Sequence, residues 1–408
     1  MKCVKLTIVW AMTCFLLLSG CGSVTMTNPT VPSETIHNSA EASQEMADNR
    51  YSFFSGMSFQ ETDAYFCGSN LSGSILHYYD KDSGISGVLC PDPACVHDST
   101  SCGAYVAAGA TLSIHDGMRY YISKDPQENS ADLYLWKSEL SGSNRKKVKP
   151  LSFEQVILPY QPQRYIVHQG MLYLQGQSDV VQDGRSGYRV TLLSSPLDGS
   201  ENFTTLFDET VNSGVQTTVR FVPNAVYFSI MTFPEGGPFH LKVIRFDTST
   251  GASETVYEES EMSEIPGAVW VSKEGKIYLP GTDSSHAYVW ELGDNARTEL
   301  ISWSGDGVSM PKVADDVIIY ITQKDGNRWI NVANLSGDVI YSGKLFSQSI
   351  PELEGDPNEF SLAFVGGDSE KLIFNLQSFT ENGMGDATVL FDLHENMKPT
   401  VLWSSLDH

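Results

Sequence analysis

The body of the chain repeats at intervals of roughly 50 residues, and this repetition constrains the fold more than any other sequence feature. Each copy starts with a turn and a strand rich in aromatic or aliphatic residues. A second strand follows and ends in a tight turn. Seven copies lie between residues 51 and 408. The matched residues of the first strand are Tyr65, Tyr120, Tyr173, Tyr227, Tyr278, Ile319 and Ile373.

A unit of this length supplies about four strands, and a four-stranded sheet cannot bury both of its faces alone. Sheets arranged radially around an axis bury their faces against one another and protect their edges. The sequence therefore predicts an all-β fold, a β-propeller of seven four-stranded blades over residues 51–408. A pair of sandwiches and a propeller of six or eight blades are the alternatives, because one spacing is only 41 residues and the last copy is weak.

The first 20 residues have the layout of a secretory signal peptide. Lys2 and Lys5 precede an apolar run at residues 6–18, which is shorter than the roughly 20 residues that a membrane-spanning helix needs. Small residues then precede Cys21, and this sequence resembles the lipobox of bacterial lipoproteins. The resemblance implies that Cys21 carries acyl chains such as palmitate and anchors the protein to the cell membrane on its extracytoplasmic side. An ordinary signal peptide with a chance cysteine is the alternative.

Residues 22–50 are rich in Ser, Thr, Asn, Pro and acidic residues, with no sustained apolar period. This composition predicts a disordered tether that spans roughly 30 Å as a flexible coil. The predicted organisation is a signal peptide at residues 1–20, a lipidated N-terminus and tether at 21–50, and the propeller at 51–408.

The chain is strongly acidic, with 50 Asp and Glu residues against 26 Lys and Arg and a formal net charge of −24. Phosphate backbones repel such a surface, so nucleic acid is excluded as an expected partner. The acidity is typical of a soluble body outside the cell.

Four cysteines follow the tether, and three of them share a short polar segment with a histidine. The segment CPDPACVHDSTSC at residues 90–102 has the spacing C-x4-C-x-H-x4-C. Three interpretations remain open: two disulfide bridges, a closed structural zinc site of three thiolates and one imidazole, or free thiols. The segment lies between the first two repeats, and in each case we expect the cluster to stabilise this long link. The candidate disulfide cysteines are Cys67, Cys90, Cys95 and Cys102, and the candidate zinc ligands are Cys90, Cys95, His97 and Cys102.

Taken together, the lipobox, tether and Cys/His segment resemble a group of β-propeller lipoproteins of Gram-positive anaerobes. The segment matches that group at Cys90, Pro93, Cys95, His97 and Cys102. The repeats are also similar, more loosely, to TolB-like and low-density-lipoprotein-receptor-like propellers. The resemblance implies a lipid-anchored propeller but carries no activity with it.

No metalloprotease, nucleophile-elbow, P-loop or dinucleotide motif occurs in residues 51–408. We therefore expect a binding or interaction module for a protein, peptide or glycan, with no cofactor beyond the zinc alternative. A glycan-active hydrolase or lyase with acidic residues at the propeller axis is the second hypothesis, by analogy of fold. A metal-binding or redox role of the Cys/His segment is the third.

Overall fold

The computed structural model of the chain describes most of the region predicted as the propeller. The residues described are 59–69, 75–97, 101–106, 112–125, 133–151, 165–182, 185–283, 285–293, 296–304, 309–346, 350, 353, 355–380 and 383–404. The predicted signal peptide, Cys21 and the tether lie outside them. In the part of the chain that is described, no helix has the length and apolar character needed to cross a bilayer.

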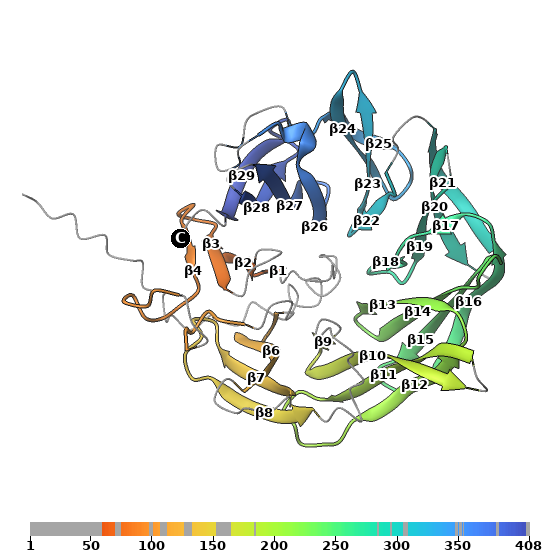
Figure 1. Cartoon of the computed structure of the whole chain (residues 1–408), viewed down its shortest axis with the longest axis horizontal. Helices are drawn as coiled ribbons and strands as arrows, with labels where there is room; N and C mark the ends of the chain where they lie inside the picture. The colour runs from red at the N-terminus through yellow and green to blue at the C-terminus, as the bar shows by residue number, and fades with distance from the viewer. Residues whose placement is uncertain are drawn as a thin grey trace, which may run out of the picture.

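Seven antiparallel sheets stand around a common axis, each with its first strand nearest the axis and its last strand at the rim (Figure 1). The first three sheets are β1 (Phe59–Glu61), β2 (Tyr65–Ser69), β3 (Leu76–Asp80) and β4 (Ser86–Val88); β5 (Ser113–His115), β6 (Met118–Lys124), β7 (Leu133–Glu139) and β8 (Lys146–Leu151); and β9 (Tyr165–His168), β10 (Met171–Gln182), β11 (Arg185–Pro196) and β12 (Thr204–Val211). The fourth is β13 (Gly214–Val222), β14 (Ala225–Phe233), β15 (Phe239–Asp247) and β16 (Ser253–Met262).

The fifth blade differs slightly, because its innermost strand is split into two short pieces. It consists of β17 (Ile265–Pro266), β18 (Trp270–Val271), β19 (Ile277–Thr282), β20 (His286–Gly293) and β21 (Ala296–Ser304). The last two blades are β22 (Lys312–Ala314), β23 (Val317–Lys324), β24 (Asn327–Asn334) and β25 (Val339–Lys344), then β26 (Ser361–Gly367), β27 (Lys371–Thr380), β28 (Gly383–Asp392) and β29 (Lys398–Ser404). The 3-10 turn η1 (Pro357–Glu359) is the only helix among the described residues. The predicted seven-bladed, all-β propeller is confirmed.

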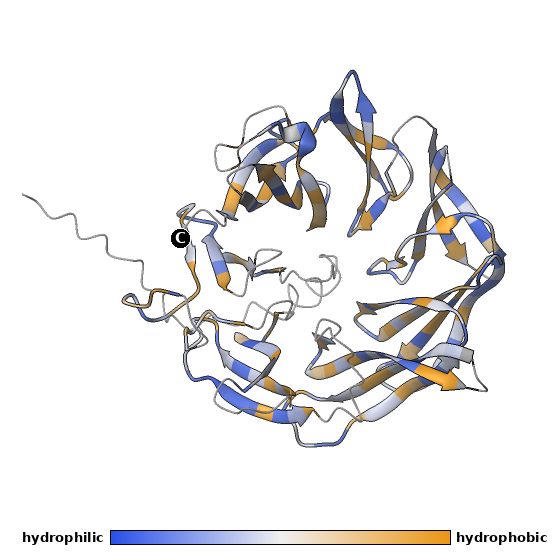
Figure 2. Ribbon diagram, viewed as in Figure 1, coloured by the Kyte–Doolittle hydropathy of each residue, from blue (hydrophilic) through white to orange (hydrophobic). Residues whose placement is uncertain are grey.

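The core lies between neighbouring blades. The second and third strands are packed on both faces, so they contain continuous apolar runs such as residues 317–320 of β23, all of which are buried. Outer strands such as β21 have one exposed face and alternate in polarity, as Figure 2 shows along the rim. Each fully buried Val, Leu, Ile or Phe side chain contributes about 1.5–3 kcal/mol, so the contacts between blades hold the ring together.

One repeat position requires correction. Tyr65 directly follows the bend Asp63–Ala64, as Met118 directly follows the turn Asp116–Gly117. Cys67, two residues further on, therefore lies at the position of Tyr120. The other matched residues occupy equivalent buried positions on the second strands. The predicted alignment of the first copy was wrong because the aromatic Tyr65 lies two residues before Cys67, which occupies the matched position.

Among the described residues the ring closes without strand exchange, since each of their sheets consists of consecutive strands. We call the interface between the seventh and first blades the seam. Trp403 of β29 crosses it, stacking on Phe59 at 5.7 Å and on His77 at 6.1 Å between ring centroids. At its edge, Glu61 Oε1 accepts hydrogen bonds from Lys81 Nζ and from Lys371 Nζ of the last blade, both at 2.7 Å. In the described part of the chain, side-chain contacts rather than strand pairing therefore close the ring.

Candidate metal centre

The Cys/His segment leaves the first blade after its outer strand β4 and returns to the same blade. The Leu89 amide donates to the carbonyl of Leu76, and the Leu76 amide donates to the carbonyl of Ala104. The segment is therefore held at both ends by the start of β3. This places it beside the second blade, which begins a few residues later (Figure 1).

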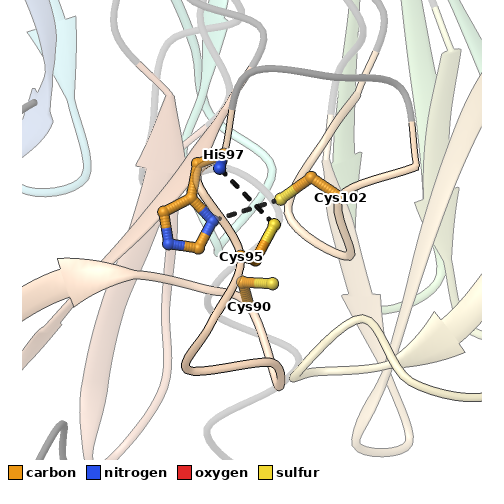
Figure 3. Close-up of side chains that lie close together, drawn as sticks. All are labelled: Cys90, Cys95, His97 and Cys102. Carbon is orange, nitrogen blue, oxygen red and sulfur yellow. Dashed lines mark hydrogen bonds between the residues drawn. The ribbon is translucent and has the colours of Figure 1, made fainter.

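Four side chains of the segment converge in space, and we call them the Cys/His cluster: Cys90, Cys95, His97 and Cys102 (Figure 3). One ligand atom from each lies within 4.8 Å of all the others, and His97 Nδ1 lies 3.4 Å from Cys102 Sγ. Tetrahedral zinc with zinc–sulfur bonds near 2.3 Å places its ligands about 3.8 Å apart. No separation among the four ligand atoms therefore exceeds this value by more than about 1 Å.

Backbone amides donate to two of the sulfurs. The His97 amide lies 3.4 Å from Cys95 Sγ, and the Ala104 amide lies 3.3 Å from Cys102 Sγ. In each case the donor is two residues after the cysteine. The backbone of His97, whose amide donates to Cys95 Sγ, is in the left-handed region (φ 57°). Amide donors favour the charged thiolate, which is the form that binds metal.

The cysteines of the cluster differ in their tendency to ionise. Burial raises the pKa of the Cys102 thiol to about 12. At Cys90 burial acts in the same direction, but hydrogen bonds with the backbone at Asp92 and Gly103 and with the side chains of Cys102 and Cys95 together outweigh it and lower the pKa below its usual range. A bound divalent cation would replace the proton at Cys102, since metal ions bind the deprotonated thiol.

Cys67 is not a member of this group. It lies in β2, 2% exposed, and burial raises the pKa of its thiol to about 12. All four cysteines of the described region are free thiols in the structure. The disulfide alternative stays a prediction about the oxidised protein, whereas the four side chains of the zinc alternative are brought together.

Two arginines of the second blade hold the end of the segment, and neither was predicted from the sequence. Arg119 Nη2 donates to the carbonyl of Gly103, and Arg145 Nη2 donates to those of Cys102 (3.2 Å) and Tyr105 (3.1 Å). The repeats contained a signal for Arg119, because every other copy is apolar at its position. The equivalent residues are Phe66, Leu172, Val226, Ile277, Ile318 and Leu372.

Comparison with protein families and with curated protein sequences found no match. Solved structures with a similar fold include puromycin hydrolase, with 13% sequence identity, a TM-score of 0.51, and 88% of this chain and 54% of that chain covered. The propeller fold is what they share. TolB from Acinetobacter baumannii is also among the neighbours, at 14% identity and a TM-score of 0.35, with 71% of this chain and 63% of that chain covered. The chain thus spans about half to two-thirds of the length of these two proteins.

Proposed function

We propose that this chain is a membrane-anchored binding module, in which a lipid on Cys21 holds the propeller on the extracytoplasmic side and its loops recognise a protein, peptide or glycan. The observation that carries the proposal is the complete ring. Every strand of the described residues belongs to one of the seven blades. A rigid ring with irregular loops at both ends presents a broad surface suited to recognition.

The anchor is tested by replacing Cys21 with serine. The variant is expected to move from the membrane fraction to the soluble or secreted fraction and to lose labelling by a fatty-acid probe, because serine is not acylated at a lipobox. Cys67→Ser, which alters a thiol of the propeller, is the control and should stay in the membrane fraction. A Cys21→Ser variant that remains membrane-bound and labelled would contradict the anchor.

Binding is distinguished from catalysis by incubating the purified chain with arrayed polysaccharides and peptides. We expect retention of one ligand class without release of products, because no catalytic motif with defined spacing occurs in residues 51–408. The fold also occurs in puromycin hydrolase, so cleavage is the outcome to exclude. Product release above a heat-killed control, abolished by one Asp→Ala or Glu→Ala change at the axis, would replace the binding proposal with a hydrolase or lyase.

For the Cys/His cluster we propose a structural zinc ion. Three thiolates and one imidazole form a closed tetrahedral shell, which leaves no open position for substrate. The convergence of the four ligand atoms within 4.8 Å and the amide donors to Cys95 and Cys102 support this. Elemental analysis of the full chain is the test. About one zinc per chain is expected, and a reduced protein that contains and takes up none would exclude the site.

A further inference from the structure

Arg119 is a charged residue in an apolar core position. Its side chain is 0% exposed, on the face of the second blade that packs against the first. Its Nε donates to Ser138 Oγ at 2.7 Å, and Nη1 is buried without a hydrogen-bond partner. Burying a guanidinium is costly unless an opposite charge compensates it, and the other six blades avoid the cost with an apolar residue. The exception occurs in the blade that adjoins the Cys/His cluster.

Arg145 adds a second positive charge beside the first. Both guanidinium groups lie 5.7 Å from the ring centre of Tyr121. Among the described residues neither arginine forms an ion pair with a carboxylate, although the chain has an excess of acidic residues. Arg119 Nη2 and Arg145 Nη2 donate instead to backbone carbonyls of residues 102, 103 and 105, at and just after the last cysteine of the cluster. An anion at this end of the segment would therefore compensate the two like charges.

A divalent ion bound by three thiolates and a neutral imidazole supplies that anion, because such a centre has one net negative charge. We infer that Arg119 and Arg145 provide the positive charge that balances an anionic metal–thiolate centre, and that they are positioning residues for Cys102 that raise its metal affinity. The inference rests on the proposed zinc site. Hydrogen bonds to the carbonyls fix the backbone around Cys102, as outer-shell partners fix the ligands of other metal sites.

Arg119→Met tests this in the full-length chain, since methionine keeps the length and apolar stem but removes the charge. Zinc dissociation constants are measured by competition with a chromophoric chelator, with Co²⁺ absorption as a second readout of tetrahedral thiolate ligation. We expect zinc to bind about 10–100-fold more weakly, the range typical for loss of an outer-shell partner. Arg119→Lys, which keeps the charge, should recover part of the affinity.

The matched control is Arg220→Met. Arg220 is also a buried arginine, which donates to the carbonyl of Val269 at 3.1 Å and stacks over Trp270, but it lies in the fourth blade. Its loss should lower stability and leave zinc affinity unchanged. If Arg119→Met does not fold, Arg145→Met gives the same measurement at a half-buried position. If the folded Arg119→Met or Arg145→Met variant binds zinc with wild-type affinity, the inference is wrong and the proposed zinc site is retained. If the wild-type chain binds no zinc, the zinc site itself is excluded.

Discussion

Replacing Cys102 with serine is expected to abolish zinc binding and to lower the free energy of unfolding by about 4 kcal/mol in zinc-saturated buffer. The reason is mass action, because a ligand present at about 1,000 times its dissociation constant stabilises the folded state by about that amount. Cys102 is the ligand most deeply placed, 2% exposed, and its backbone is held by Arg145. Metal content and urea denaturation, with and without a strong chelator, measure the two effects.

The control for this change is Cys67→Ser, which replaces an equally buried thiol of the same apolar cluster outside the ligand group. It should retain one zinc per chain and remain sensitive to the chelator. In the chelator, wild type and Cys102→Ser should differ far less than in zinc. If wild-type stability does not respond to zinc removal, zinc does not stabilise this fold.

Trp403→Ala is expected to cost about 3–5 kcal/mol, the range for truncating a large buried aromatic side chain. Trp403 is 1% exposed and lies between Phe59 and His77 of the first blade. Because none of the described strands crosses the seam, little backbone pairing compensates for the lost contacts. Urea denaturation measures the stability, and hydrogen exchange should show the largest loss of protection in the first and last blades.

Phe379→Ala is the control on the same blade. Phe379 is 68% exposed in β27, so its removal should change stability by less than about 0.5 kcal/mol. A Trp403→Ala variant as stable as wild type would show that the seam does not depend on this residue. An equal loss of exchange protection in all seven blades would show that the ring opens as one unit.

The blade count was predictable because the second and third strands of each blade are buried on both faces. Their apolar runs, such as those around Tyr173 and Tyr227, are visible in the sequence. Inner strands were harder to place, since β17 and β18 have only two residues each and no periodicity can emerge over that length. The first copy was misaligned because Cys67 occupies the position where the other copies have a tyrosine or an isoleucine.

The members of the candidate site were predictable from spacing, but their environment was not. Residues 90–102 are close in sequence, so local chain reversal suffices to bring their side chains together. Convergence also depends on the left-handed backbone at His97, which its residue type does not require. Arg145 contacts Cys102 from 43 positions away, through packing of one blade on the next. Only comparison among the repeats marks Arg119 as unusual.

Because every blade is a continuous piece of chain, the ring is modular in an evolutionary sense. Duplication or deletion of one whole unit would cut no hydrogen-bonded sheet, since each sheet begins and ends within its own segment. In a ring closed by an exchanged strand, the same event would leave one sheet incomplete. Gene rearrangements that move whole units would therefore leave the hydrogen bonds within each blade intact, and the unit carrying residues 90–102 would also need to keep the neighbour that contributes Arg119 and Arg145.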